Sequence, residues 1–343
     1  MLTDKSLKIG SKNICQVENT LIENEISGKI LYVSDAIVNS LYGEVVKEQI
    51  DNVGYVKEEI IDNNTISYAM NVAERVIATD VACIVAVGGG RVLDVCKYAA
   101  FIAKVPILSI PTTIANDGIA SPIAVLKRQD NKPKSLGCSV PQMVLIDVDI
   151  IANGPIEHIK AGIGDTISNY MSLIDWSFAV EKGKDTMNGY AYLMSQTALN
   201  ALLSTRYDSI CSEFIEVLAN SVVMSGIAMD FAKSSRPVSG SEHLFSHALD
   251  YYAKKTNLHG FQVALGTIAS LKLIGYSYSK VGNYLKRFDV DIKPSHLNIS
   301  EETFVECFKN APTMRQNRYT YLHSMDLNEA LLKKVYWEIE EEF

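Results

Sequence analysis

Apolar positions in the first part of the chain alternate between two periodicities. Short apolar runs typical of buried strands occur at 30–33, 53–56, 81–87 and 106–110. Between these runs lie segments with the apolar spacing of helices, at 36–50, 66–78 and 92–103. Strands that alternate with helices imply right-handed crossovers and a parallel sheet covered on both faces. The pattern predicts an α/β domain of nucleotide-binding type over residues 1–155.

The pattern changes after Ser121. A strand-like SPIAVLKR, a polar turn, a return strand and the apolar QMVLIDVDII follow, and six of the nine prolines lie between residues 106 and 155. The rest of the chain is poor in proline and has helical apolar spacing, for example at Leu327, Leu331 and Val335. We therefore expect an all-helical domain over residues 156–343, with the active site in the cleft between the two domains.

Composition narrows the class of protein. A chain of 343 residues suggests about two domains, and 48% hydrophobic with 21% charged residues is typical of a globular protein. A net charge of −8 without a basic run excludes nucleic-acid binding as the main function. The six cysteines contain no CxxC pair, and the longest uncharged run, 186–205, includes polar residues. With no apolar signal segment at the N-terminus, we expect a soluble cytoplasmic protein without a membrane span.

Two segments of the first domain have the features of a dinucleotide site. In VACIVAVGGGRVLDVCK, a strand leads through Gly88, Gly89 and Gly90 into a helix, whose N-terminal N–H groups suit a pyrophosphate. The alternatives are a plain tight turn and, for Asp94, a solvated acid in the first helical turn. In IPTTIANDGIASP, polar residues follow a strand, at the sheet edge where α/β folds bind ligands. Asp117 is there either a functional acid or a turn former.

Candidate metal ligands occur in the second part. His243 and His247 lie four residues apart in SRPVSGSEHLFSH, on one face of a helix that we expect to begin near Ser239 or Ser241 with a hydroxyl cap. Asp165 in AGIGD is either a ligand or a helix cap, and His259 in LHGFQVALG is either a ligand or a structural histidine. One aspartate with two histidines is the donor set of an open catalytic zinc site.

Together these motifs resemble one known family. GGGRVLD, PTTIANDGIASP, AGIGD, SRPVSGSEHLFSH, LHG and Arg318-Tyr319-Thr320 resemble the glycerol-1-phosphate dehydrogenases, in the dehydroquinate synthase-like and iron-containing alcohol dehydrogenase superfamily. The match runs from about residue 30 to 325. It implies an NAD(P)-dependent, metal-assisted interconversion of dihydroxyacetone phosphate and sn-glycerol 1-phosphate, a step of phospholipid biosynthesis, by a homo-oligomeric enzyme.

The resemblance also implies roles for single residues. Asp165, His243 and His259 correspond to the ligands of zinc, with nickel and iron as alternatives. Catalytic roles fall to Asp117, Asp165 and His247, and substrate contacts to Asn116, Asp117, Arg236 and His247. The cofactor residues are Asp35, Gly88, Gly89, Gly90, Asp94, Thr112, Thr113 and Ser121. An acid at Asp35 would repel a 2′-phosphate, which favours NAD over NADP.

Three residues bear on the substrate and the cofactor. Asn116 stands where many relatives have histidine, and Arg91 where many have serine or threonine. Arg236 is either a bidentate clamp for a substrate phosphate or part of an interdomain salt bridge. The alternatives that stay open are a glycerol or other polyol dehydrogenase, a dehydroquinate synthase-like cyclase, and a phosphosugar-binding protein without catalytic activity.

Overall fold

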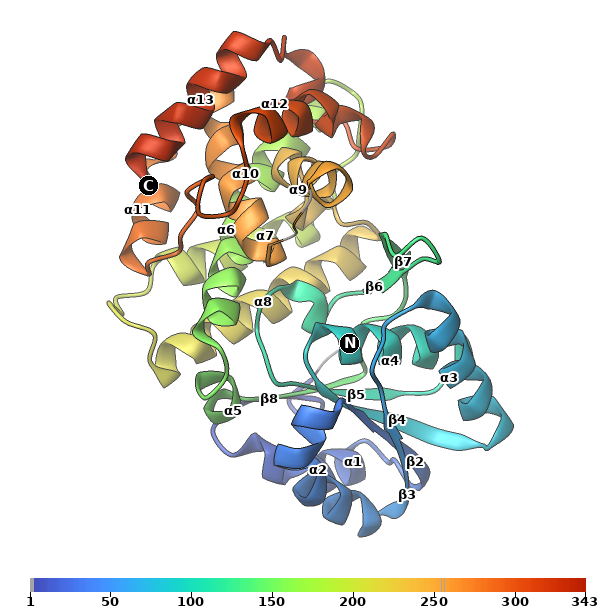
Figure 1. The fold of residues 1–343 in the computed structure, drawn as a ribbon. Coiled ribbons are helices and arrows are strands. Elements are labelled where there is room, and N and C mark those ends of the chain that lie inside the picture. Colours follow the sequence, from blue (N-terminus) through green and yellow to red (C-terminus); the bar gives the residue numbers. More distant parts are fainter. Residues whose placement is uncertain (1–2, 254, 256) are drawn as a thin grey trace. The chain divides into compact units, whose positions relative to one another are not determined.

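The computed structural model describes residues 3–253, 255 and 257–343 (Figure 1). The chain divides into two compact units. Unit 1 comprises Met1–Ile156 and Cys211–Gly226, and unit 2 comprises Glu157–Ile210 and Ile227–Phe343. A single boundary near residue 155 therefore does not describe the whole chain, because residues 211–226 return to unit 1. The predicted boundary marks only the first passage of the chain from unit 1 to unit 2.

Unit 1 is built on a six-stranded sheet in which every neighbouring pair is parallel. In spatial order its strands are β1 (Leu7–Gly10), β8 (Met143–Asp147), β5 (Ile107–Pro111), β4 (Val81–Gly88), β2 (Gly28–Ser34) and β3 (Gly54–Ile60). A separate antiparallel pair consists of β6 (Ile123–Lys127) and β7 (Pro133–Gly137). The predicted parallel sheet of the first domain is confirmed.

Helices cover both faces of this sheet (Figure 1). The short η1 (Asn13–Gln16), α1 (Val17–Glu23) and α2 (Ala36–Asp51) lie on one face, and α3 (Ile66–Ala78) and α4 (Gly90–Ala103) lie on the other. Right-handed crossovers require this division, because the chain moves across the sheet in opposite directions before and after β3. Between α2 and the sheet, fully buried side chains such as Ile30, Val85 and Leu108 form a hydrophobic core.

The main difference from the sequence-based expectation lies at the edge of the sheet. The periodicity predicted the helix over 66–78 with the bounds that α3 has, and it found β2, β4 and β5 within one or two residues. It missed β1, in which Lys8 and Gly10 interrupt the apolar run, although its residues pair with β8. The apolar QMVLIDVDII also divides into two elements, β8 and the short α5 (Val148–Ala152).

The described residues of unit 2 form helices and loops without a strand, which confirms the predicted all-α part. Its α-helices are α6 (Ile156–Glu181), α7 (Gly189–Leu203), the C-terminal end of α8 (Ser212–Ala232), α9 (Ser241–Tyr252), α10 (His259–Leu273), α11 (Ser279–Arg287), α12 (Glu301–Asn310) and α13 (Glu329–Glu342). Its short 3₁₀ turns are η3 (Arg236–Val238), η4 (Ala311–Thr313) and η5 (Tyr321–Ser324).

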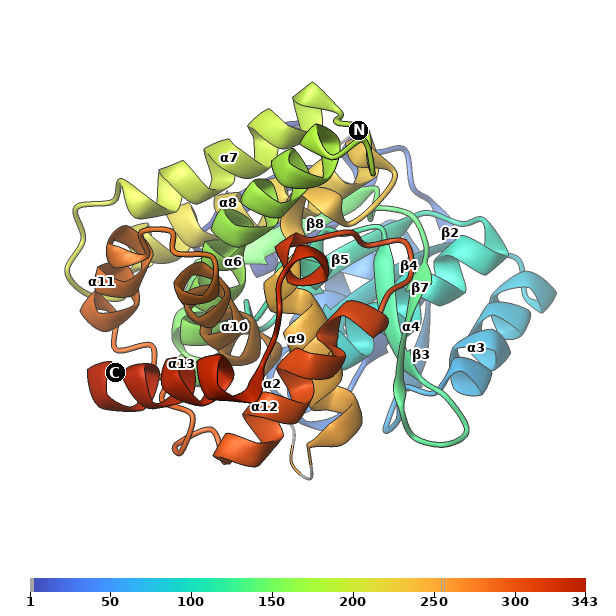
Figure 2. The same ribbon diagram turned by 90° about the horizontal axis from the view of Figure 1, so that it is seen from above.

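Four helices of unit 2 pack side by side: α9 contacts α10 and α12, and α13 contacts α10 and α12 (Figure 2). Aromatic rings fill the space between α9 and α12, where Phe245 stacks on Phe308 with ring centroids 4.3 Å apart. Phe304 contacts both rings. Burial of three phenylalanines fixes α9 in unit 2, and α9 contributes the two histidines of the predicted metal motif.

Of the described helices, α8 is the only one long and apolar enough to cross a membrane by length and composition. Its apolar window is 61% buried in the structure. This burial is that of a core helix, and the buried residues include Phe214, Leu218 and Val222.

Candidate functional site

The glycine motif of unit 1 lies at a topological switch point. The chain leaves β2 toward β3 on one side and leaves β4 toward β5 on the other, although β2 and β4 are neighbours. Ser34 and Val87 are paired near the carboxyl ends of these strands. Ligands of open α/β sheets bind outside the carboxyl ends of strands at such a point. The topology therefore favours a cofactor site beside Asp35 and the three glycines.

Gly88, Gly89 and Gly90 have different structural roles at the turn. A side chain at Gly88 would clash with Val92, so the strand-to-helix turn itself requires this glycine. Gly89 is the N-cap of α4 and has no side chain to satisfy the first N–H groups of the helix. A β-carbon on Gly90 would meet nothing within 4 Å. Uncapped N–H groups beside open space are what an anion site at a helix N-terminus needs.

Other predicted cofactor residues lie at the same edge of the sheet. Asp35 follows β2 and caps α2, with Oδ1 accepting hydrogen bonds from the N–H groups of Ile37 and Val38, both at 3.0 Å. Thr112 follows β5, and its N–H donates to the carbonyl oxygen of Gly88 at 3.1 Å. Thr113 Oγ1 would lie 3.4 Å from a β-carbon on Gly89. Three strand ends therefore bring Asp35, Thr112 and Thr113 to the glycine turn.

Asp94 is not the solvated first-turn acid of the alternative interpretation. Its Oδ1 lies 3.0 Å from Nζ of Lys97, whose side chain is fully buried. Burial raises the pKa of Asp94, while the charge of Lys97 lowers it. Lys97 is thus an ion-pair partner of Asp94, and the cofactor role of Asp94 stays a prediction.

Lys97 is a residue to which the sequence analysis gave no role. Besides its ion pair, its ammonium group donates to the carbonyl oxygens of Gly118, at 2.6 Å, and of Ile123. These carbonyls flank the predicted substrate and cofactor residues in IANDGIASP, among them Ser121, which is buried. A lysine three residues after an acid in an amphipathic helix gives no signal of burial, because this spacing is common on exposed faces.

The loop that Lys97 holds carries Asn116 and Asp117. Asn116 Oδ1 accepts a hydrogen bond from the N–H of Gly118 at 2.9 Å, and this local turn begins η2 (Asp117–Ile119). Burial raises the pKa of Asp117 to about 6, against the opposing charge of Lys97. A carboxyl group with this pKa can exchange a proton near neutral pH, which suits a catalytic acid or base.

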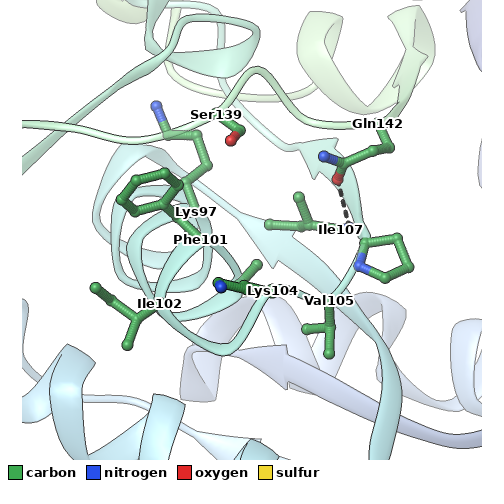
Figure 3. A pocket seen from close by; sticks show the side chains of 10 residues that line it. Lys97, Phe101, Ile102, Lys104, Val105, Ile107, Ser139 and Gln142 are labelled. Carbon is green, nitrogen blue, oxygen red and sulfur yellow. Dashed lines mark hydrogen bonds between the residues drawn. The ribbon is translucent and has the colours of Figure 1, made fainter.

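A cavity of about 590 Å³ also lies in unit 1 (Figure 3). Phe101, Lys104, Ser139 and Gln142 are among its lining residues, and Gln142 accepts a hydrogen bond from the N–H of Ile107 at 3.0 Å. It lies beside the end of α4 and the beginning of β5, at the amino edge of the sheet. None of the predicted cofactor residues is among its lining residues, and the glycine turn lies at the opposite, carboxyl edge of the sheet.

The predicted metal ligands converge in unit 2. Ligand atoms of Asp165, His243 and His259 all lie within 4.8 Å of one another. Nε2 of His259 is 3.7 Å from Oδ1 of Asp165, and the rings of His243 and His259 have centroids 4.9 Å apart. Donor atoms that share one tetrahedral zinc ion, at bonds of about 2 Å, are separated by distances of this order.

Glycines bring the ligand-bearing helices together. A side chain on Gly164 would overlap the carbonyl oxygen of Gly260, and one on Gly260 would overlap the carbonyl oxygen of Ala161. The backbones of α6 and α10 therefore touch where Asp165 and His259 each stand next to a glycine. The sequence analysis expected Gly164 to allow a close approach. Its alternative for Asp165 is wrong, because Asp165 lies inside α6 (Ile156–Glu181) and caps nothing.

Hydrogen bonds set the tautomers of both histidine ligands. Glu242 Oε1 accepts from Nδ1 of His243 at 2.8 Å. The Ser246 hydroxyl donates to Oε1 of Gln262 at 2.6 Å, so its oxygen accepts from Nδ1 of His259 at 3.1 Å. Each ring then has an unprotonated Nε2, the form that binds a metal. Glu242 and Ser246 lie inside the histidine motif, and their roles appear only once the rings are placed.

Burial and nearby cations keep the histidines neutral. Burial, with the charges of Arg315 and Arg318, lowers the pKa of His243 to about 3. Burial, with His243 and Arg315, lowers the pKa of His259 to about 3. The donor set of one carboxylate and two neutral imidazoles fits a divalent cation with an open coordination position.

His247 lies on the same face of α9 as His243, with ring centroids 6.4 Å apart. Its Nε2 is buried and has no hydrogen-bond partner among the described residues. Burial, followed by the charge of Arg315, lowers its pKa well below the ordinary value. The expected helix start is confirmed at Ser241, but the expected hydroxyl cap is wrong: the N-cap is Gly240, and the N–H of Ser241 donates to Oδ2 of Asp175 at 2.6 Å.

Arg236 is buried and forms a salt bridge within unit 2. Its Nε contacts Oδ2 of Asp185, and its Nη1 donates to the carbonyl oxygen of Tyr319 at 2.8 Å. The salt bridge of the alternative interpretation exists, but it joins two residues of unit 2 and not two domains. Nη2 stays buried without a partner among the described residues, so one nitrogen is left for a further acceptor.

Known proteins resemble this chain over most of its length. A family model described as iron-containing alcohol dehydrogenase matches residues 8–155. The glycerol-1-phosphate dehydrogenase [NAD(P)+] of Thermofilum pendens is 36% identical over 90% of this chain and 89% of its own. That of Hyperthermus butylicus is 34% identical over 93% and 92%. The crystal structure of glycerol dehydrogenase from Schizosaccharomyces pombe shares the fold, with a TM-score of 0.79 at 16% identity over 100% of this chain and 90% of that one.

The relatives at 36% and 34% identity align with nearly the whole chain, including both units. The protein therefore belongs to the glycerol-1-phosphate dehydrogenase family.

Proposed function

We propose that the protein interconverts dihydroxyacetone phosphate and sn-glycerol 1-phosphate as an NAD(P)-dependent, metal-assisted dehydrogenase. The observation that carries this proposal is the convergence of Asp165, His243 and His259, from three helices, in a chain of this family. A protein that only binds a phosphosugar has no need of three ligands with an open fourth position. The glycine turn at the switch point of unit 1 supports the dinucleotide half of the proposal.

The residues of the metal site divide into ligands and residues that orient them. Asp165, His243 and His259 would hold the cation, with zinc as the expected ion and nickel or iron as alternatives. Glu242 and Ser246 bind the Nδ1 atoms, which leaves the Nε2 lone pair of each ring for the cation. When bound, the cation would supply Lewis-acid polarisation of the substrate carbonyl, and NAD(P)H would supply the hydride.

Two residues of the chain are candidates for proton transfer and for hydrogen bonding to the substrate. His247 has a buried Nε2 that would form a hydrogen bond with a substrate hydroxyl, since nothing else among the described residues uses it. Asp117, with its pKa near 6, would take up or release the proton at a carboxylate oxygen. Asn116 and Asp165 complete the predicted substrate contacts, and Arg236 keeps Nη2 for a phosphate oxygen.

The cofactor preference is proposed from Asp35. Its Oδ1 caps α2, which leaves Oδ2 for a ribose hydroxyl. A carboxylate there disfavours the 2′-phosphate of NADP, so NAD is the expected cofactor. Arg91, which is exposed near the glycine turn, would moderate this preference by attracting phosphate charge.

The cellular setting is also a proposal. All six cysteines are free thiols, which suits a reducing compartment such as the cytoplasm. A homo-oligomer, which the resemblance implies, is to be tested by light scattering of the purified protein.

One experiment separates this function from its alternatives. The metal-stripped protein is given dihydroxyacetone phosphate, dihydroxyacetone or glyceraldehyde, and oxidation of NADH and NADPH is followed with and without added zinc. We expect zinc-dependent turnover of the phosphorylated ketone, faster with NADH. Activity on the unphosphorylated substrates alone would make the protein a polyol dehydrogenase. Steady NADH turnover argues against a dehydroquinate synthase-like cyclase, which uses its cofactor only transiently.

A further inference from the structure

Three arginines gather around the loop that precedes α9. Nη1 of Arg315 donates to Ser235 Oγ at 3.0 Å, and Nη2 of Arg318 donates to the same oxygen at 2.7 Å. Nη1 of Arg318 also donates to the carbonyl oxygen of Ser239 at 2.6 Å. Arg236 follows Ser235 directly and binds the carbonyl oxygen of Tyr319, next to Arg318. We call Arg236, Arg315 and Arg318 the arginine cluster.

The cluster has more positive charge than its contacts neutralise. Arg236 is paired with Asp185. Arg318 is buried and held by a hydroxyl and a backbone carbonyl, with the charges of Glu242 and Asp185 within electrostatic range. Arg315 forms no ion pair with any described acidic residue, and it donates instead to the neutral hydroxyl of Ser235. A half-buried guanidinium without an anion is costly, unless a ligand supplies the anion.

The three arginines also repel one another, because their positive charges lie close together. Burial, then the charges of Arg315 and Arg236, lowers the pKa of Arg318 to about 9. A second feature points in the same direction, since Nη2 of Arg236 is buried in a side chain that is only 4% exposed and has no described partner. An anion with several acceptor oxygens would satisfy both guanidinium groups at once.

The cluster also lies beside the metal site. Arg318, which shares Ser235 Oγ with Arg315, donates to the carbonyl oxygen of Ser239, just before α9 begins. The next residue, Gly240, donates its N–H to Oε1 of Glu242, which also binds Nδ1 of His243. In dihydroxyacetone phosphate, one methylene group and one ester oxygen separate the carbonyl carbon from phosphorus. The arginine cluster at the start of α9 is therefore a candidate site for that phosphate.

We propose that Arg315 is the specificity-determining residue for the substrate phosphate, with Ser235 and Arg318 holding its guanidinium in place. This inference rests on the proposed function, which it deepens by naming the residue that distinguishes a phosphorylated ketone from an unphosphorylated one. The sequence analysis had chosen Arg236 for this role. Two of its three nitrogens already bind Asp185 and Tyr319, so it would be a secondary contact of the substrate phosphate. The planar fork of Arg315 suits two phosphate oxygens.

The test compares Arg315→Ala and Arg315→Lys with the wild-type, zinc-loaded enzyme. For dihydroxyacetone phosphate we expect kcat/KM of Arg315→Ala to fall about 10- to 100-fold, mainly through KM, the range for losing a charge-assisted hydrogen bond. For dihydroxyacetone we expect little change. Arg315→Lys keeps the charge without the fork and should fall in between. Arg206→Ala, which removes an exposed arginine from the same unit, is the matched control and should behave as wild type.

Three outcomes would overturn the assignment. In the first, Arg315→Ala keeps the wild-type preference for the phosphorylated ketone. In the second, Arg315→Ala and Arg315→Lys lose activity on both ketones to the same degree, which would indicate a general structural role. In the third, the KM for NADH rises instead, which would place a cofactor phosphate on Arg315.

A binding measurement separates this inference from the proposed function. Inorganic phosphate, compared with chloride at equal ionic strength, should raise the melting temperature of the zinc-loaded wild type and of Arg206→Ala but not that of Arg315→Ala. If the wild type reduces neither ketone while this pattern holds, the proposed function is wrong and the anion site stands. Equal stabilisation of all three proteins, or of none, would overturn the site itself.

Discussion

Nε2 of His259 lies 3.7 Å from Oδ1 of Asp165 because α6 and α10 meet backbone to backbone at Gly164 and Gly260. The two glycines stand next to the two ligands in sequence, so the distance between the helix backbones directly sets the distance between the ligand atoms. Metal affinity and helix packing should therefore change together. Gly164 and Gly260 are expected to influence metal affinity although neither is a metal ligand.

A methyl group between these helices is predicted to weaken metal binding. In Gly260→Ala the added β-carbon overlaps the carbonyl oxygen of Ala161, so α10 has to move away from α6. We expect at least a tenfold loss of zinc affinity, and a loss of about 1–3 kcal/mol in the free energy of unfolding, as for other overpacked sites. Titration with a chelator and thermal unfolding measure the two effects. Gly189→Ala in α7, where nothing lies within 4 Å, should show neither.

Variants of His259 and His247 should differ in their zinc content. His259→Ala removes a ligand and is expected to yield protein without stoichiometric zinc. His247→Ala removes the buried Nε2 on the substrate side and should retain zinc while kcat falls about 10²- to 10⁴-fold, the range for lost acid–base groups. Elemental analysis of both purified variants, together with their turnover, decides the matter. Equal zinc content in the two would contradict this division of roles.

Ser246 should tune the metal without touching it. In Ser246→Ala, Nδ1 of His259 loses its acceptor and Oε1 of Gln262 loses its donor. The ring of His259 is then free to rotate or change tautomer, and zinc affinity should fall about 10- to 100-fold, as for other partners of metal-bound histidines. Competition with a chromogenic chelator gives the affinity. Ser204→Ala, at an exposed position after α7, serves as the control, and a wild-type affinity in Ser246→Ala would refute the role.

Lys97 is predicted to be essential for the stability of unit 1. Lys97→Met keeps most of the side-chain volume but leaves Asp94 without its cation and the carbonyl oxygens of Gly118 and Ile123 without a donor. Breaking a buried ion pair in this way costs about 3–5 kcal/mol in the free energy of unfolding. Urea unfolding measures it, with Lys57→Met at an exposed position of β3 as the control. A loss no larger than in that control would show that the buried ammonium is dispensable.

The periodicity of the sequence determined most of the secondary structure and the fold class. The helical spacing over 66–78 marks α3, and the apolar run 81–87 marks β4, because a side chain's burial follows from the local geometry of its own element. The motifs also named Asp165, His243 and His259, which the structure brings within ligand distance of one another. Edge strand β1 was missed because Lys8 and Gly10 interrupt its apolar run, and only its pairing with β8 identifies it as a strand.

Tertiary structure alone decided what each of these residues contacts. It placed Asp165 inside α6 and not at a helix start, gave Lys97 a buried position with Asp94, and paired Arg236 with Asp185. It also brought Arg315 to Ser235 from a distant part of the chain. Local spacing fixes which face of an element is apolar, whereas contacts between polar groups depend on how helices pack. That packing is set by shape and by close contacts such as those of Gly164 and Gly260, which no periodic pattern records.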